Sequence, residues 1–282
     1  MTTSRNNQAP NPPGARVALL DKQKVRESFG RAAPRYDEIA ELQRRIGERL
    51  LAHLDPVPAS FSPAAVLDVG AGTGVCLGPL EARYPGARVI ALDLAEGMLR
   101  EARRAERVSE RGLFVCGDAE RLPFRADSID LLFSNVTVQW CNDLAEACRE
   151  FARILRPGGL LVFSTFGPDT LWELRESWGQ TDGDSHVNAF IDMHHIGDML
   201  IQTGFTGVVM DRDDVVCTYG SVHDLMRELK TLGAHNATHD RPRGLTGRKH
   251  LQAMVNAYER HRHNDRIPAT YEVIHAYGRL PG

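Results

Sequence analysis

Short apolar segments alternate with helical stretches between residues 65 and 166, and this pattern limits the possible folds more than any other feature of the sequence. The apolar segments span residues 65–69, 88–93, 113–116, 129–134 and 160–165. Strands that take turns with helices form right-handed crossovers and a parallel sheet. "LRPGG" at residues 155–159 is typical of a helix end and a turn before the last of these strands. The sequence therefore predicts an α/β fold.

The flanking segments predict helical additions to this core. Apolar residues at spacings of three and four indicate amphipathic helices before Pro56. Two later strands, near residues 208–219 and 270–278, flank a helical stretch of about fifty residues, far longer than an ordinary connection. We expect a disordered tail at 1–20, cap helices at 21–56, a core at 57–220, a helical insertion or lid at 221–266 and the last strand at 267–282.

Composition excludes several classes of protein. The net charge of -3 argues against a general nucleic-acid binder. Neither a long apolar run nor a signal-like N-terminus is present, so we expect a soluble, cytoplasmic protein without a membrane anchor. Five cysteines without CxxC spacing indicate buried free thiols. For the histidines at 194, 195, 261 and 263, no nearby acid or thiol completes a tetrahedral set of ligands, so we expect no metal site.

A glycine-rich loop follows the first predicted strand, in "VLDVGAGTG" at residues 66–74. Glycine permits a tight turn and close approach of a ligand to the backbone. The loop alone is a weak signal, because a dinucleotide fingerprint also begins with such a turn. That fingerprint, GxGxxG, would place its last glycine at Val75, whereas this sequence has Gly74 one residue earlier.

Two acids at the ends of later strands distinguish the possible ligands. Asp93 ends the second strand, where a carboxylate can accept both ribose hydroxyls. Asp118 ends the third, where it can accept the exocyclic amine of an adenine. Adenosine without phosphates fits the loop and both acids, which favours S-adenosylmethionine. The open alternatives are that both acids cap the helices after them, or that the chain is a dehydrogenase.

In this order of motifs the sequence resembles the class I S-adenosylmethionine-dependent methyltransferases. The resemblance covers residues 64–166 and includes Asp68–Gly74, Asp93, Asp118-Ala119 and "ILRPGG". It implies a Rossmann-like, seven-stranded, mostly parallel sheet with helices on both faces, and S-adenosylhomocysteine as the product. It also implies the cofactor-binding residues, with the N-terminal helices and the fourth strand adding the last three: Asp68, Gly70, Gly72, Gly74, Asp93, Asp118, Ala119, Gln43, Arg44 and Asn135.

The residues at the end of the fourth strand bear on the class of methyl acceptor. "SNVTVQW" at 134–140 lacks the Asn-Pro-Pro-Tyr signature of enzymes that methylate amides and exocyclic amines. A carboxylate, with a pKa of about 4, is already ionised at neutral pH and needs no catalytic base. The sequence permits a carboxylate acceptor, and we assign no catalytic residue.

A closer resemblance covers residues 28–278. "SFGRAAPRYDEIAELQ", "FSTFGPDTLWELRESW", "VNAFIDMHHIGDML", "RGLTGR" and "PATYEVIHAYG" are similar to segments of the malonyl-acyl carrier protein O-methyltransferases of biotin synthesis, the BioC family. That family methylates the free malonyl carboxylate so that fatty-acid synthesis can elongate the ester toward pimelate. The resemblance implies malonyl-acyl carrier protein, or malonyl-coenzyme A, as the substrate.

Three residues are candidates for binding the acceptor. Arg175 follows the fifth strand and offers the planar fork that suits a carboxylate. Tyr36 is placed to donate its hydroxyl from the N-terminal helices, and Ser164 to line the pocket from the fifth strand. Each also has a structural interpretation: a helix-surface ion pair with Glu173 or Glu176 for Arg175, and core packing or a strand-end position for the other two.

The segment 241–266 is a candidate docking surface for an acidic carrier protein. Its cations, counted from residue 239, outnumber its acids by four: Arg241, Arg243, Arg248, Lys249, Arg260, Arg262 and Arg266 against Asp240, Glu259 and Asp265. Such a surface steers an acidic partner, although a solvated helical face explains it equally well. Two other functions stay open: methylation of another small acid or a quinone precursor, and an assembly protein that keeps the fold without transferring a methyl group.

Overall fold

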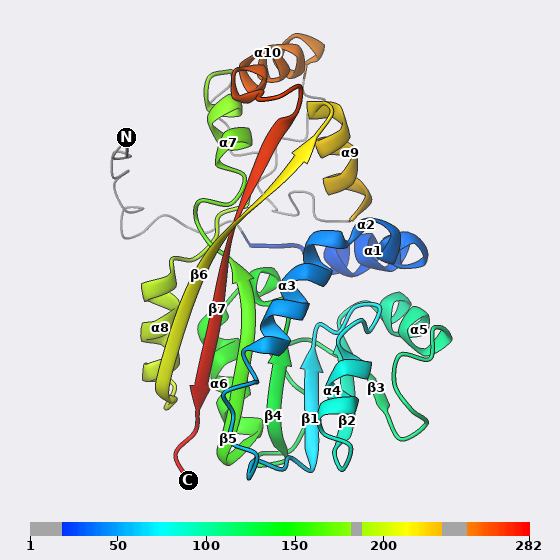
Figure 1. Cartoon of the computed structure of the whole chain (residues 1–282), viewed down its shortest axis with the longest axis vertical. Coiled ribbons are helices and arrows are strands. Elements are labelled where there is room, and N and C mark those ends of the chain that lie inside the picture. The colour runs from blue at the N-terminus through cyan, green and yellow to red at the C-terminus, as the bar shows by residue number, and fades with distance from the viewer. Residues whose placement is uncertain (1–18, 182–187, 233–246) are drawn as a thin grey trace.

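The computed structural model of the protein describes residues 19–181, 188–232 and 247–282 (Figure 1). These residues form a seven-stranded sheet in the order β3-β2-β1-β4-β5-β7-β6. β1 to β5 pair in parallel, and β7 runs antiparallel to β5 and β6. The strands are β1 Ala65–Val69, β2 Arg88–Asp93, β3 Leu113–Cys116, β4 Ile129–Ser134, β5 Leu155–Phe166, β6 Thr206–Tyr219 and β7 Ile267–Arg279. The predicted α/β, Rossmann-like fold is confirmed. Most of the predicted tail, residues 1–18, lies outside the described residues.

Helices cover both faces of the sheet and bury two apolar clusters. Successive strand residues point to opposite faces, so Val66 packs beneath α3 Glu41–Ala52, α4 Leu77–Arg83 and α5 Glu96–Arg104. Its neighbour Leu67 packs on the other side, with α6 Leu144–Ile154 and α8 Met193–Gln202. Burying each leucine-sized side chain contributes about 1.5–3 kcal/mol. The two layers fix the sheet whose carboxyl edge carries the candidate site.

The start of β5 differs from the sequence prediction. "LRPGG" was expected to be a helix end and turn, but α6 ends at Ile154 and these five residues already belong to the strand. Ile129 pairs with Leu155 and Leu131 with Leu160, so the register shifts between them. Gly158, with a φ of 75°, takes up the irregularity. A glycine in the left-handed region lets a bulge continue a strand where a turn was expected.

The last two strands extend well beyond the rest of the sheet, as Figure 1 shows. β5 pairs with residues 273–279 of β7, whereas β6 pairs with β7 back to Ile267. Around this ribbon pack α7 Trp172–Gly179, α9 Val222–Thr231 and α10 Arg248–Tyr258, which share an apolar cluster with it. The helices α9 and α10 fall in the proposed insertion 221–266, of which residues 233–246 lie outside the described ranges.

The N-terminal helices cross the carboxyl edge of the parallel strands (Figure 1). α1 Lys22–Ala32 is capped by Asp21, whose side chain accepts hydrogen bonds from the backbone N–H groups of residues 23 and 24. α2 Tyr36–Ile39 and α3 come next. Leu20 exchanges two hydrogen bonds with the side chain of Asn142, and Arg26 donates to the carbonyl of Leu94. These contacts hold α1 over the ends of β2 and β4.

Among the described residues, every helix is too short or too polar to span a bilayer.

Candidate active site

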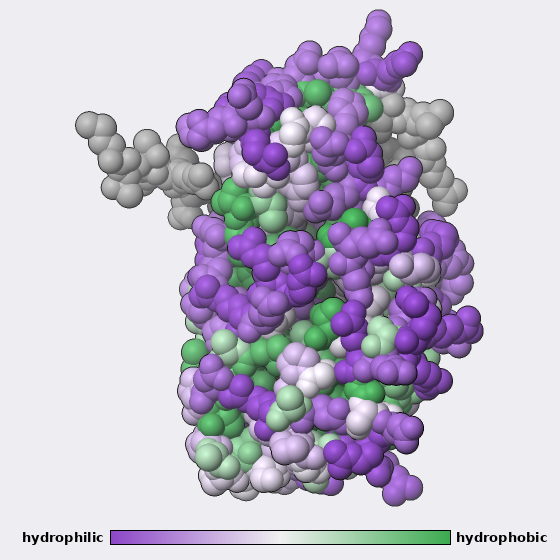
Figure 2. Space-filling view, turned by 45° about the vertical axis from the view of Figure 1, so that its right-hand side comes forward, coloured by the Kyte–Doolittle hydropathy of each residue, from purple (hydrophilic) through white to green (hydrophobic). Residues whose placement is uncertain are grey.

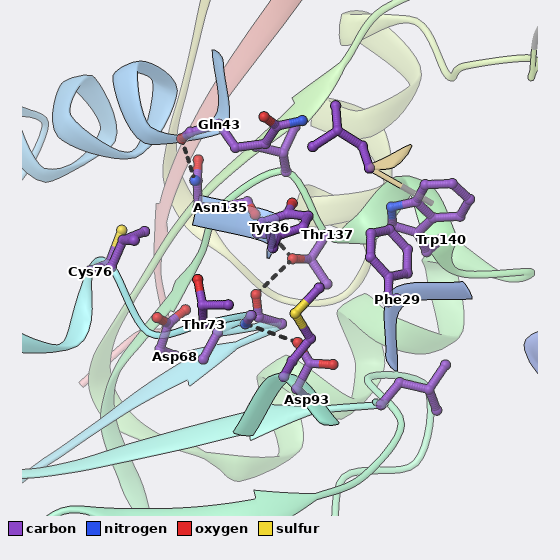
Figure 3. A pocket seen from close by; sticks show the side chains of 18 of the residues that line it. Phe29, Tyr36, Gln43, Asp68, Thr73, Cys76, Asp93, Asn135, Thr137 and Trp140 are labelled. Carbon is purple, nitrogen blue, oxygen red and sulfur yellow. Dashed lines mark hydrogen bonds between the residues drawn. The ribbon is translucent and has the colours of Figure 1, made fainter. Parts of the chain in front are cut away.

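A pocket lies at the carboxyl ends of β1, β2 and β4, beneath α1 and α2 (Figure 3). Asp68 and Asp93 lie on one side of it, Gln43 and Asn135 on the opposite side, and Tyr36 between them. This is the edge at which open parallel sheets bind ligands. The lining residues are Val25, Phe29, Tyr36, Gln43, Asp68, Gly70, Ala71, Gly72, Thr73, Val75, Cys76, Asp93, Leu94, Met98, Asn135, Val136, Thr137, Gln139, Trp140, Phe166 and Leu232.

The glycine loop forms the floor of the pocket. Gly70 and Gly72 line it, and both have positive φ, 74° and 56°. A Cβ on Gly70 would lie 2.1 Å from Oγ1 of Thr137, so only glycine fits where this loop meets the loop after β4. Gly74 also has a positive φ, 82°, but it packs against Leu77 and does not line the pocket.

Asp93 ties the end of β2 to the glycine loop. Its Oδ2 accepts from the backbone N–H of Gly72 at 2.9 Å, and its Oδ1 accepts from that of Ala95 at 2.7 Å. Burial raises the pKa of this carboxyl to about 6, although the two backbone hydrogen bonds act to lower it. Each carboxylate oxygen has a second acceptor site, so Asp93 can also accept from ribose hydroxyls.

Asp68 is the most perturbed acid in the pocket. Its side chain is buried, and Oδ1 has no hydrogen-bond partner among the described residues. Burial, with the nearby charge of Asp93, raises its pKa to about 8. A buried acceptor without a hydrogen-bond partner destabilises the folded protein. A cationic donor on a bound ligand would therefore stabilise the ionised form of Asp68.

Asp118 does not line the pocket, and its carboxylate pairs with a lysine from α1. Nζ of Lys22 lies 2.8 Å from Oδ1 of Asp118 and also contacts Glu120. Ala119, the residue after it, is buried in the core beneath the sheet. The expected contact between Asp118 and an adenine amine therefore stays a prediction, with one carboxylate oxygen already paired.

The α3 side of the pocket is fixed through Asn135. Its Nδ2 donates to the carbonyl of Gln43 at 2.9 Å, while its Oδ1 accepts from Oγ of Ser164 at 2.8 Å. Oε1 of Gln43 is buried without a hydrogen-bond partner among the described residues. Arg44 is exposed and pairs with Glu41, away from the pocket lining. Of the predicted pair on α3, the structure brings Gln43 to the site.

Aromatic residues of the N-terminal cap close the pocket above the loop. Phe29 packs edge-on against Trp140, with ring centroids 5.2 Å apart, and against Tyr36 at 6.3 Å. Burial, with the charges of Asp93 and Asp37, raises the pKa of Tyr36 well above its usual value. Its phenol is therefore neutral at physiological pH and can donate a hydrogen bond.

The other two predicted acceptor residues lie elsewhere. Ser164 is fully buried behind Asn135. Arg175 donates from one guanidinium nitrogen to the carbonyls of Pro168 and Thr170, each at 2.6 Å, and does not line the pocket. Neither of the anticipated partners, Glu173 or Glu176, accepts from it: Glu173 is buried and bonds Thr270.

Sequence reasoning missed several residues that line the pocket. Val25 and Phe29 belong to a helix recognised only by its spacing. Phe166 is the last residue of β5, and Leu232 follows α9, in the stretch expected to form a helical insertion or lid. Val136 has a φ of 48°, rare for a β-branched residue, and is held by hydrogen bonds from its N–H to Oγ and O of Ser164. The motif "SFG" near the N-terminus was the available signal for Phe29.

Comparison with known proteins identifies the family. A profile described as a methyltransferase domain matches residues 67–163. A malonyl-acyl carrier protein O-methyltransferase of Methylovorus sp. (strain MP688) is 49% identical over 270 residues, covering 93% of this chain and 90% of that relative. The chain belongs to the malonyl-acyl carrier protein O-methyltransferase family. The family resemblance proposed from the sequence is confirmed, and with it S-adenosylmethionine as the methyl donor.

Two further matches are a longer, bifunctional relative and a solved structure with the same fold. The biotin biosynthesis bifunctional protein BioHC of Cellvibrio japonicus (strain Ueda107) is 43% identical over 259 residues, which cover 92% of this chain and 50% of that protein. A phosphoethanolamine N-methyltransferase 2 of Haemonchus contortus, solved with S-adenosylhomocysteine, superimposes with a TM-score of 0.55. At 17% identity, covering 92% of this chain and 60% of that one, it shows the shared fold.

Proposed function

We propose that this protein transfers the methyl group of S-adenosylmethionine to the free carboxylate of malonyl-acyl carrier protein, giving the methyl ester that begins pimeloyl synthesis for biotin. Membership of the family carries the choice of acceptor. The pocket supports the choice of donor, because its glycine loop and buried acids lie where an adenosyl ligand without phosphates would bind. The test is formation of malonyl methyl ester by the purified protein.

The residues that line the pocket offer acceptors suited to S-adenosylmethionine. Asp68 and Gln43 each have a buried oxygen without a partner among the described residues, and both line the pocket. We assign Asp68 and Gln43 to the methionine part, with the backbone of Gly70 and Gly72 alongside, and Asp93 to the ribose. When bound, the cofactor supplies a sulfonium methyl group for in-line displacement.

The pocket walls suit a reaction in which two opposite charges disappear. The sulfonium becomes a thioether and the carboxylate becomes a neutral ester. Apolar side chains, among them Phe29, Met98, Val136, Trp140 and Phe166, surround the site and exclude water. Solvated ions lose more by entering such a pocket than the less charged transition state does, so the environment lowers the barrier. The remaining task is alignment of carboxylate and methyl group.

Cofactor binding is expected to strengthen as pH rises through the range in which Asp68 ionises. The pKa of Asp68 is raised to about 8, so at pH 6 the free protein holds a proton that an ammonium ligand must displace. Calorimetric titration with S-adenosylhomocysteine should therefore show tighter binding at pH 8 than at pH 6, with proton release near neutral pH. Asp68→Asn should remove this dependence. A wild-type affinity that does not change between these pH values would contradict the assignment.

The raised pKa of Asp68 also affects the stability of the folded protein without ligand. The folded-state pKa of Asp68 lies above its unfolded value, so its contribution to stability is full at acidic pH and is lost as pH rises toward about 8. Asp68→Asn should therefore raise the melting temperature more at pH 8 than at pH 5.

We assign the neutral hydroxyl of Tyr36 as the donor to the malonyl carboxylate, because it lines the pocket and makes no hydrogen bond to another described residue. A phenol can orient a carboxylate without the strong ion pair that would reduce its nucleophilicity. Arg175 uses one guanidinium nitrogen to bind the carbonyls of Pro168 and Thr170 and does not line the pocket, so its assignment would require the acceptor to bind beyond the pocket lining.

Arg175→Ala separates these possibilities. If Arg175 binds the malonyl carboxylate, turnover should be lost while S-adenosylhomocysteine still binds, because the residue lies outside the cofactor pocket. Steady-state rates and calorimetry on the same preparation provide both readings. An unaltered rate would remove Arg175 from the site.

For the carrier protein, we propose docking on the basic segment 241–266. Residues 241–246 lie outside the described ranges. Arg262 pairs with Glu259, and Arg266 donates to Thr218, so both have partners. Three other cations make no ion pair within the part of the chain that the structure describes: Arg248, Lys249 and Arg260. In Figure 2, hydrophilic side chains cover most of the upper end of the molecule, where Figure 1 shows α10.

Reversing two of these charges should weaken recognition of the carrier protein but not of its cargo. In the variant Arg248→Glu/Lys249→Glu, KM for malonyl-acyl carrier protein should rise about tenfold at low salt, because the partner is acidic. KM for malonyl-coenzyme A should stay unchanged. Arg100→Glu, on the distant α5 and 74% exposed, is the matched control. Equal effects on both substrates would place the docking surface elsewhere.

All five cysteines are free thiols, in keeping with a reducing compartment, and we include the cytoplasm in this proposal as the site of the reaction.

A further inference from the structure

Asp37 joins three parts of the molecule that are far apart in sequence. It lies in α2, immediately after Tyr36. Its Oδ1 accepts a short hydrogen bond from Oγ1 of Thr73, in the glycine loop. Its Oδ2 lies 2.5 Å from a guanidinium nitrogen of Arg107, in the loop after α5. One carboxylate therefore ties the N-terminal cap to the floor of the pocket.

The bond to Thr73 distinguishes this contact from an ordinary surface ion pair. The side chains of Asp37 and Arg107 are 41% and 36% exposed, and a pair with that exposure contributes little to stability. Thr73, however, is only 3% exposed and lines the pocket. The hydrogen bond is thus made at the wall of the candidate site, where it can affect the shape of the pocket more than the stability of the fold.

The position of Tyr36 depends on this short helix. α2 has four residues and is closed by the hydrogen bond from the N–H of Ala40 to the carbonyl of Tyr36. The ring of Tyr36 rests on Ala33, Ala95 and Met98, which constrain it by packing alone. The side chain of Asp37 is the polar contact by which α2 is fixed to the loop beneath it.

We propose that Asp37 is a positioning residue, which holds α2 on the glycine loop through Thr73 and Arg107 and thereby sets the Tyr36 hydroxyl over the methyl-transfer site. The inference rests on the role proposed for Tyr36. It requires no contact between Asp37 and either substrate. Its charge also helps to keep the Tyr36 phenol protonated, together with burial and Asp93.

A double-mutant cycle tests the proposal. Asp37→Ala should lower kcat/KM for malonyl-acyl carrier protein about tenfold, as expected when a reacting group is misplaced, while KM for S-adenosylmethionine changes little. In a Tyr36→Phe background the same change should lower kcat/KM less than about twofold, because the effects of substituting two residues that act through one another are not additive. Asp37→Asn, which keeps an acceptor for Thr73, should fall between wild type and Asp37→Ala. Glu38→Ala is the control, since its neighbouring carboxylate pairs only with exposed Arg35 within the described residues.

Equal losses from Asp37→Ala in both backgrounds would overturn the proposal, because they would indicate a general structural role. No loss in the wild-type background would overturn it too. A second measurement does not depend on the acceptor: S-adenosylhomocysteine should slow hydrogen exchange of the Ala40 amide in the wild type but not in Asp37→Ala. If the wild type forms no malonyl ester, the proposed function fails, and hydrogen exchange still decides whether Asp37 couples the cap to the loop.

Discussion

Replacing Asp93 with alanine is expected to weaken binding of S-adenosylhomocysteine at least about 100-fold, on the basis of two lost hydrogen bonds to a charged group at about 1.5–3 kcal/mol each. The carboxylate is proposed to accept from the ribose hydroxyls. It also accepts from the N–H groups of Gly72 and Ala95. The substitution therefore removes the proposed ligand contact and the hydrogen bond to Gly72, although the N–H groups of Gly70 and Ala71 still donate to the carbonyl of Leu92.

Asp93→Asn tests the same site with less disturbance. An amide keeps one acceptor but presents an N–H₂ group to a backbone N–H, so binding should fall between wild type and Asp93→Ala. Isothermal titration calorimetry on folded variants provides the affinities, and circular dichroism verifies the fold. Asp55→Ala, an exposed acid that pairs with Arg83, is the control. Unchanged affinity in Asp93→Ala would contradict the assignment of the adenosyl site.

Replacing Tyr36 with phenylalanine is expected to lower kcat/KM for malonyl-acyl carrier protein about tenfold or more, the value of a hydrogen bond to a charged group. The loss should lie mainly in KM for the acceptor, because a donor to the carboxylate stabilises the bound anion in the ground state at least as much as the less charged transition state. Affinity for S-adenosylhomocysteine should change little, since the ring and its packing with Phe29 are kept.

Tyr84→Phe is the matched control, because that ring packs against Phe61 on another part of the surface. Initial rates at several concentrations of each substrate separate kcat from the two KM values. If Tyr36→Phe weakened cofactor binding and left the acceptor KM unchanged, the hydroxyl would belong to the cofactor site instead.

The fold could be predicted because its signals are local. Each strand from β1 to β4 is a short apolar run bounded by turns, and the order of strand and helix determines the parallel pairing. The place of Gly70 and Gly72 at the floor of the pocket was predictable for a similar reason, since a tight turn with positive φ favours glycine. Asp93 was predictable from its position at the end of β2. In each case the relevant partners are neighbours in sequence or in the sheet.

The rest of the site depends on contacts between distant segments, which spacing cannot reveal. Lys22 reaches Asp118 across 96 positions of sequence, and Asp37 reaches Thr73 across 36. Ser164 lies at the end of β5 as expected, but the loop after β4 covers it, so its hydroxyl binds Asn135 and the backbone of Val136. "LRPGG" resembles a turn by composition, whereas the pairing of Leu155 with β4 and the backbone bonds of Gly158 and Gly159 to Leu280 make it part of a strand.

The most direct test of the account is mass spectrometry of malonyl-acyl carrier protein incubated with the purified protein and S-adenosylmethionine. We predict that the carrier protein gains the mass of one methylene group, as a free carboxyl becomes a methyl ester, with one S-adenosylhomocysteine released for each ester formed. Acetyl-acyl carrier protein, which lacks the free carboxylate, should remain unmodified. A protein that binds S-adenosylhomocysteine but leaves the malonyl group unmethylated would contradict the proposed function.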